Sequence, residues 1–182
     1  MGQYYKAIII PMLKDVRVLD SWAHNDGAKL MEHSYMGNDF VMDAVIQMIS
    51  DNPVRLAWVG DYSKGGPDEW TDVKKSFHRE IFDIAWGGED KGYSNNKRYK
   101  CIQDLYIINL DKGEYCTFSP FPDNCRICSL PLLCAVGNGL GGGDYHGINM
   151  EMIGSWAYDE LRVTTRRPLG IRCLDGVFEE KE

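Results

Sequence analysis

Short runs of β-branched and aromatic residues, separated by turn residues, dominate the hydrophobic pattern of this chain. The run Tyr4–Ile10 is predicted to be a strand that returns through Val16–Leu19 as an antiparallel hairpin. The run Val54–Val59 is apolar on both faces, so we expect it inside a sheet and not at its edge. A second hairpin is predicted over residues 105–118, where Gly113 suits the left-handed position of the turn.

Two segments have the spacing of amphipathic helices instead. After Asn38, a good N-cap residue, apolar side chains recur on one helical face as far as Ile49. A second apolar stripe begins at Val73 and ends before Gly87, and His78 on this helix is predicted to face solvent. Each helix therefore needs an apolar surface to pack against.

The carboxyl-terminal third adds further strands. Residues 153–163 have the aromatic content of a strand, and residues 171–178 are predicted to form a small hairpin. The segment 88–98, rich in glycine, asparagine and charge, is predicted to be a surface loop. Strands outnumber helices and come in hairpins, so we predict a single α+β domain over residues 1–182. We expect an antiparallel or mixed sheet with the two helices packed on one face.

Six of the eleven residues from Gly137 to Gly147 are glycine, directly after an apolar run. Such density usually indicates positive φ angles or a close approach to the main chain. The main-chain N–H groups of this stretch can cradle a phosphate or another small anion. The spacing of Gly137, Gly139 and Gly142 fits a dinucleotide-binding turn, but the residues that follow are a poor helix start. A structural turn that lets two strands approach closely is the other interpretation.

Two carboxylate–tyrosine pairs follow glycines at predicted strand ends. If those strands are parallel neighbours, Asp61 and Asp144 converge on one cleft, and Asp144 with His146 has the components of an acid–base pair. A simpler interpretation has each aspartate accepting turn N–H groups while each tyrosine packs. We assign no catalytic residue. The candidate ligand- or partner-binding residues are Gly139, Gly141, Gly142, Gly143, Asp144, Tyr145, His146, Asp61 and Tyr62.

Four clustered cysteines, Cys116, Cys125, Cys128 and Cys134, are enough in number for a tetrahedral zinc site. Their spacing is irregular, with one C-x-x-C pair where a zinc module usually has two. Cys116 and Cys134 also fall within apolar patterns, where cysteine behaves as a small hydrophobic residue. We therefore predict neither a metal nor a cofactor, and keep these four thiols as weak candidates.

The net charge of the chain restricts the classes of partner that it can bind. Twenty-seven acidic and twenty basic residues give a formal net charge of −7, which argues against binding nucleic acid by counterion release and against an anionic membrane. No export signal or membrane-spanning stretch is recognised, so we expect a cytoplasmic protein with free thiols. Arg162, Arg166 and Arg167 form the main basic cluster, which suits an acidic partner or phosphate, or else a solvated strand edge.

Aromatic residues are abundant, with five tryptophans and ten tyrosines. Aromatic side chains that stay exposed often mark interfaces. Trp58 and Trp156 fall in predicted strands and are expected in the core. Trp70 and Trp86 flank the second helix and are the candidates for exposure.

Six segments are spread over most of the chain. They are MGQYYK at 1–6, LMEHSY at 30–35, WVGDY at 58–62, NLDK at 109–112, GNGLGGGDY at 137–145 and GSWAYD at 154–159. With these segments the chain resembles a family of small bacterial and bacteriophage proteins of unknown function. The family has no established activity, so the resemblance implies no functional residue.

Three functional hypotheses follow. The preferred one is a non-catalytic binding protein, an accessory protein of a phage or mobile element that binds and inhibits a host protein, such as a defence protein. The second is a small-molecule or nucleotide-binding protein, or an enzyme, whose pocket is built on Gly137–Gly147. The third is a zinc-stabilised interaction module.

Overall fold

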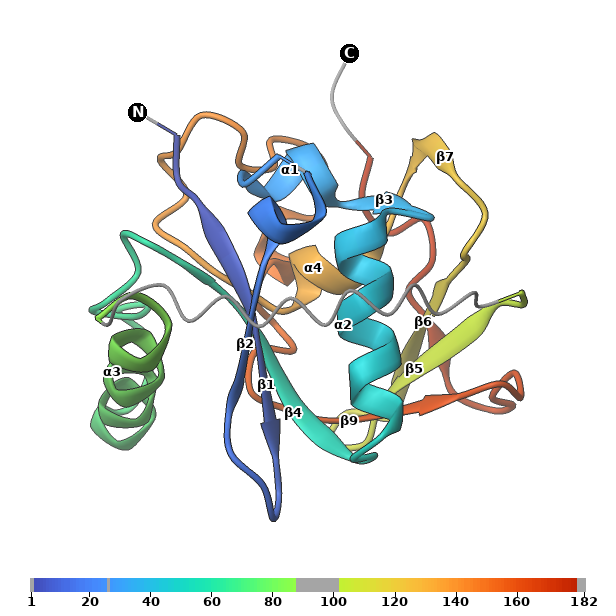
Figure 1. Cartoon of the computed structure of the whole chain (residues 1–182), viewed down its shortest axis with the longest axis horizontal. Coiled ribbons are helices and arrows are strands. Elements are labelled where there is room, and N and C mark those ends of the chain that lie inside the picture. The colour runs from blue at the N-terminus through green and yellow to red at the C-terminus, as the bar shows by residue number, and fades with distance from the viewer. Residues whose placement is uncertain (1, 26, 88–101, 180–182) are drawn as a thin grey trace.

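A computed structural model describes residues 2–25, 27–87 and 102–179, and it confirms an α+β fold with a mostly antiparallel, mixed sheet. Eight described strands form the main sheet in the order β10-β6-β5-β9-β4-β1-β2, with β8 beside β4, and β3 pairs with β7 (Figure 1). The strands are β1 (Tyr5–Pro11), β2 (Arg17–Asp20), β3 (Tyr35–Met36), β4 (Val54–Gly60), β5 (Leu105–Asn109), β6 (Glu114–Phe118), β7 (Asp123–Ile127), β8 (Ala135–Val136), β9 (Glu160–Thr164) and β10 (Arg172–Cys173).

Two long helices, α2 and α3, accompany several short helical segments. The predicted N-cap is confirmed, since Asn38 accepts a hydrogen bond from the Val41 N–H at 3.0 Å. Thr71 caps the other long helix, where it accepts a hydrogen bond from the Lys74 N–H at 3.3 Å. The described helices are η1 (Ser21–His24), α1 (Leu30–His33), α2 (Asp39–Ile49), α3 (Asp72–Trp86), α4 (Ser129–Leu133) and η2 (Met150–Met152).

Strands β1 and β4 form the centre of the molecule. They pair antiparallel over their full length, from Tyr5 opposite Gly60 to Pro11 opposite Val54. Side chains alternate between the two faces of a strand, and both strands are apolar on both faces. The prediction that 54–59 lies inside the sheet is therefore confirmed.

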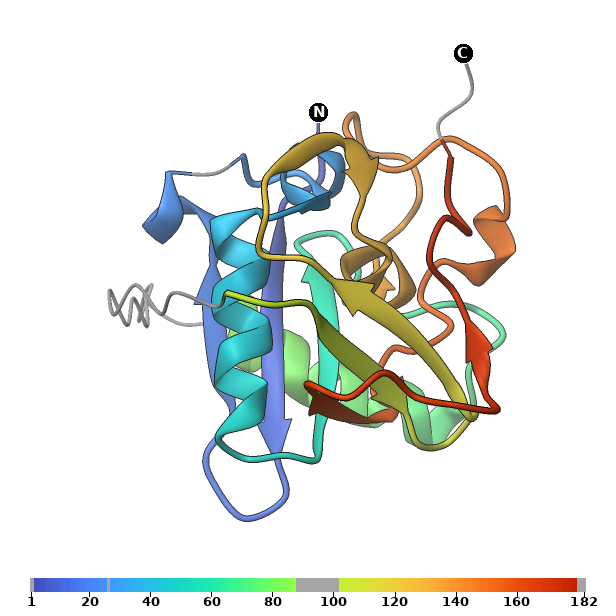
Figure 2. The same ribbon diagram turned by 90° about the vertical axis from the view of Figure 1, so that its right-hand side faces the viewer.

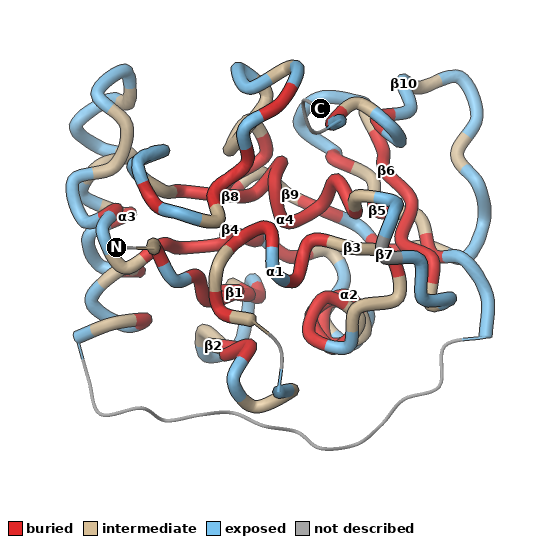
Figure 3. The backbone as a smooth tube through the Cα atoms, turned by 90° about the horizontal axis from the view of Figure 1, so that it is seen from above, coloured by how far each residue is buried: buried red, intermediate tan, exposed pale blue. Residues whose placement is uncertain are grey.

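The two main helices lie on opposite faces of the sheet, so the prediction that they share one face is wrong (Figures 1 and 3). Helix α2 packs on Ala7, Ile9 and Trp58, whereas α3 packs on Ile8 and Ala57. Seen from the α2 side, α3 lies behind the sheet (Figure 2). A central strand that is apolar on both faces needs cover on both, and one amphipathic helix serves each.

The carboxyl-terminal third differs from the prediction in two places. Strand β9 is confined to Glu160–Thr164, and the residues before it form turns that place Tyr158 at a φ of 69°. Residues 171–178 form no hairpin, because β10 pairs parallel with β6. The β5–β6 hairpin is confirmed, with Gly113 at a φ of 66°. The predicted loop 88–98 lies outside the described residues.

Candidate functional site

The candidate site begins where two parallel strands end. Strands β4 and β8 pair parallel, with Trp58 opposite Ala135 and Val59 opposite Val136. Asp61 follows β4, and the glycine-rich stretch follows β8, so both leave the sheet at the same edge. This is the parallel arrangement under which the sequence predicts convergence. Ligands often bind beyond the carboxyl ends of parallel strands.

Side chains hold the glycine stretch against the amino-terminal segment. The Asn138 N–H donates to Gln3 Oε1 at 3.1 Å, and the Gly141 N–H donates to Asp144 Oδ2 at 3.1 Å. The Tyr5 hydroxyl lies 2.9 Å from Asp144 Oδ1. The Asp144 carboxylate therefore takes one of the N–H groups that a bound anion would otherwise use.

Close approach explains one of the glycines directly. A Cβ atom on Gly141 would lie 2.6 Å from the main-chain nitrogen of Gln3, which is too close for any other residue. Gly142 differs, since a Cβ atom there would meet nothing within 4 Å. The stretch thus contains a glycine that packing requires, Gly141, and one that packing does not require, Gly142.

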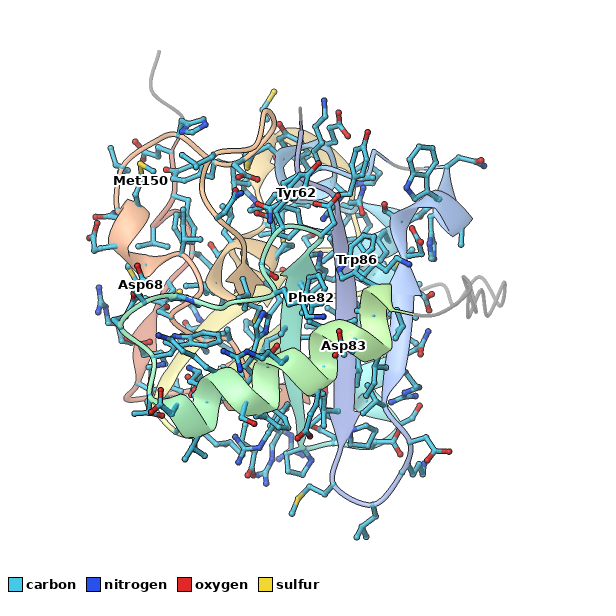
Figure 4. The ribbon with its side chains drawn as sticks, turned by 90° about the vertical axis from the view of Figure 1, so that its left-hand side faces the viewer. Tyr62, Asp68, Phe82, Asp83, Trp86 and Met150 are labelled. Atoms are coloured by element: carbon cyan, nitrogen blue, oxygen red, sulfur yellow. The ribbon has the colours of Figure 1, made fainter. Side chains whose placement is uncertain are left out.

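A cavity of about 280 Å³ lies against this stretch, and we call it the glycine-loop cavity. Its other walls are the segment 67–74, which leads into α3, and the turn 150–155. Figure 4 shows these two segments next to each other, at Asp68 and Met150. Apolar side chains on its lining include Leu30, Val136 and Ile153. The volume is slightly below the ~300–1,000 Å³ of typical drug-sized sites, so it suits a small ligand.

The charged groups of the cavity are mostly acidic. Glu69, Asp144 and Glu151 line it together with Lys74. Asp144 is 7% exposed, and burial raises the pKa of its carboxyl group against the opposing hydrogen bonds from Tyr5 and Gly141. Burial lowers the pKa of Lys74, whose Nζ lies 4.2 Å from the centre of the Trp70 ring.

Of the other candidate residues, Gly139 and Tyr145 line the cavity. The rest, which are Gly141, Gly142, Gly143, His146, Asp61 and Tyr62, are not among its lining residues. The Tyr145 hydroxyl receives the Glu179 N–H at 2.9 Å and lies 2.8 Å from the Ile148 carbonyl oxygen, which ties down the carboxyl-terminal segment. Asp61 accepts the Tyr4 N–H at 3.1 Å. The remaining members, Gly139, Gly142, Tyr62 and His146, are exposed, while Gly143 accepts the Met31 N–H through its carbonyl oxygen.

His78 is fully buried, so the prediction that it faces solvent is wrong. Its Nδ1 lies 2.6 Å from the Tyr158 hydroxyl, and its Nε2 lies 2.7 Å from the Ser63 carbonyl oxygen. Because a carbonyl only accepts, Nε2 carries the proton and Nδ1 accepts from Tyr158. The imidazole also contacts the Trp70 ring edge-on. The buried His78 side chain therefore supports Trp70, which lines the cavity.

The clustered thiols do not assemble into a metal site. Cys116, Cys128 and Cys134 are buried, and burial raises the pKa of all three thiols, that of Cys128 to about 12. Cys125 is exposed. In the part of the chain that the structure describes, no three His, Cys, Asp or Glu side chains are placed to hold a metal ion. The structure thus gives the zinc hypothesis no site among these residues.

Three residues of the cavity wall carried no usable signal in the sequence. Tyr5 belongs to a strand pattern, Lys74 to a helix pattern and Ser155 to a predicted strand. Gly139, Asp144 and Tyr145 were candidates from the glycine pattern. Trp70 was recognisable as an aromatic residue beside a helix. Only the tertiary structure brings these residues to the glycine stretch.

Comparison with protein-family models, curated proteins and solved structures gives no match for this chain. Among the described helices, none has the length and apolar character needed to cross a bilayer.

Proposed function

We propose that this protein is a non-catalytic binding protein of the cytoplasm that holds a small organic molecule in the glycine-loop cavity. The cavity itself is the observation that carries the proposal. It lies beyond two parallel strand ends, and apolar side chains and a nearly buried carboxylate share its lining. This combination of an apolar wall and a few placed polar groups is typical of small-molecule sites.

Binding is preferred to catalysis because Asp144 and His146, the two components of an acid–base pair, form no hydrogen bond with each other, although His146 is near enough to lower the Asp144 pKa. Both Asp144 oxygens take part in the loop structure, through Tyr5 and Gly141. His146 is exposed and is not among the residues that line the cavity. A general base must reach the proton that it removes, and this histidine faces solvent instead.

The test is native mass spectrometry of the protein purified from its own host, comparing Gly141→Ala with Gly142→Ala. The first substitution places a methyl group against the Gln3 main chain and should displace the loop. The second meets open space. We expect the wild-type protein and Gly142→Ala to retain a small molecule and Gly141→Ala to lose it. A wild-type chain that carries no small molecule would contradict the proposal.

A second candidate is an accessory protein of a phage or mobile element that binds and inhibits a host protein. Its support is the family resemblance together with an exposed aromatic surface, which we define as Tyr4, Trp22 and Tyr62. The Tyr4 and Trp22 rings meet edge to face at 6.3 Å, and Trp22 is 66% exposed. Figure 4 shows Tyr62 on the same side of the molecule as Trp86. A protein partner bound in stoichiometric amount in the same spectra would favour this candidate if Trp22→Ala abolishes its binding.

A further inference from the structure

Asp144 is a buried carboxylate whose hydrogen-bond partners are neutral. The Tyr5 hydroxyl and the Gly141 N–H contact its two oxygens. Within the described residues, no lysine or arginine forms an ion pair with it. A buried charge costs free energy unless an opposite charge or strong hydrogen bonds compensate it. A cation in the cavity would supply the missing compensation.

The cavity around Asp144 is mainly acidic, although the exposed His146 imidazole is near enough to lower the Asp144 pKa. Glu69 and Glu151 line the cavity, and Asp61 is near enough to raise the pKa of both Asp144 and Tyr5. Lys74 is the one ammonium group among the described lining residues, so carboxylates outnumber cations in the wall. The resulting potential attracts a positive ligand and repels a negative one.

The wall also shows that an ammonium group fits against it. The Lys74 ammonium lies over the Trp70 ring, an arrangement that stabilises a cation on an aromatic face. Ser155 adds an unsatisfied polar group, because its buried hydroxyl oxygen has no hydrogen-bond partner in the described part of the chain. Leu30, Val136 and Ile153 contribute apolar lining around these groups.

We infer that the glycine-loop cavity selects a small organic cation, a primary amine on an apolar or aromatic body, whose ammonium group pairs with Asp144. The inference rests on the proposed function, since it names the class of molecule that the same cavity holds. It departs from the small anion expected from the glycine pattern, because Asp144 occupies the place of that anion.

The experiment compares three probes of nearly the same shape by isothermal titration calorimetry. Phenethylamine carries a positive charge, 2-phenylethanol none, and 3-phenylpropionate a negative charge. We expect phenethylamine to bind at least tenfold more tightly than the other two, and its affinity to fall as acid protonates Asp144. Equal or tighter binding of the alcohol or the carboxylate overturns the inference, and so does the absence of phenethylamine binding.

Two substitutions locate the charge that matters. Asp144→Asn should abolish the preference for the amine, whereas Asp83→Asn, an equal charge change on an exposed residue of α3, should keep it. Because Asp144 also braces the loop, Glu151→Gln serves as a second variant at an exposed lining residue and should weaken the amine about twofold to fivefold. Circular dichroism checks that each variant is folded. An unchanged preference in both cavity variants would overturn the inference.

The experiments distinguish failure of the cation inference from failure of the proposed function. A retained molecule that proves neutral or anionic in native spectra would leave the proposed function standing and refute the cation. A host-purified chain with no retained molecule would contradict the proposed function whatever the three probes do.

Discussion

The two faces of the sheet are covered by helices that pack in different ways. On the α2 face, Phe40, Trp58 and His33 form a fully buried group, with Phe40 4.9 Å from the His33 ring and 5.8 Å from the Trp58 ring. The Trp58 indole N–H donates to His33 Nε2 at 3.1 Å, and His33 Nδ1 lies 2.9 Å from the Gly27 carbonyl oxygen. The three rings are fully buried, and the polar atoms of His33 and Trp58 are hydrogen-bonded.

The α3 face has the smaller buried hydrophobic cluster, and it combines aromatic rings with charged side chains. Every cation–ring contact of the described residues lies here, with Lys6 over Trp86, Lys64 over Phe82 and Lys74 over Trp70. All three rings are only partly buried, and Figure 4 shows Phe82 and Trp86 along the helix. The comparison indicates that the α2 face supplies most of the stability, while the α3 face tolerates exposed polar surface beside the cavity.

Removal of one phenylalanine from each face tests this difference in stability most directly. Phe40→Ala leaves a cavity among fully buried neighbours and should cost about 3–5 kcal/mol of unfolding free energy. Phe82→Ala removes a half-buried ring and should cost about 1–2 kcal/mol. Urea unfolding at neutral pH measures both. Equal losses in the two variants would show that the faces contribute alike.

A fall in pH should lower the free energy of unfolding through His33, which lies on the α2 face. Burial lowers the pKa of His33 to about 4, against an ordinary value near 6.5, so the folded state holds this imidazole neutral. At a pH between these two pKa values, His33 is protonated in the unfolded chain but neutral in the folded protein. The stabilising contribution is therefore complete above about pH 6.5 and is lost as the pH falls toward 4, to a total of about 3 kcal/mol.

The measurement is urea unfolding between pH 7 and pH 4.5 for the wild-type protein and His33→Gln. Burial also lowers the pKa of His78, so part of the acid sensitivity should remain in the variant. We expect a shallower pH dependence after the substitution. If the two proteins lose stability in parallel, His33 is not the group that titrates.

Local patterns were enough to predict the elements that local physics controls. Asn38 caps α2 and Gly113 turns the β5–β6 hairpin as predicted, because each role depends on a few neighbouring residues. Trp156 was expected in a strand and is buried within a turn instead. Its burial followed from its size, but its backbone depended on contacts with Leu133 that sequence alone does not give.

The candidate site was less predictable for the same reason. Asp144 was singled out by its glycine neighbours, but its partner Tyr5 lies 139 residues away in sequence. His78 was placed on the outside because the apolar stripe was counted from Val73, which is 81% exposed. The helix is rotated from that stripe, and the buried side is made by His78, Ile81 and Ala85. A polar residue can join a core when its hydrogen bonds are satisfied there.

The smallest expected effect separates stability from binding. Asn38→Ala and Thr71→Ala each remove one N-cap acceptor, from α2 and α3 respectively, and each should cost about 1 kcal/mol of unfolding free energy. Thr71 lies next to Trp70 and accepts from the N–H of Lys74, so its loss also loosens the cavity wall. Urea unfolding measures the first effect, and native mass spectrometry of retained ligand measures the second.

We expect Thr71→Ala to lose part of the retained molecule while Asn38→Ala keeps all of it, at nearly equal stability. Equal retention would mean that the start of α3 does not hold the ligand, which would leave the glycine stretch and the turn 150–155 as the binding walls. Equal loss would mean that retention follows global stability, since the Asn38 cap lies on the opposite face of the sheet from the cavity segment 67–74. Only a difference in ligand retention between the two variants would show that the α3 side of the cavity holds the ligand.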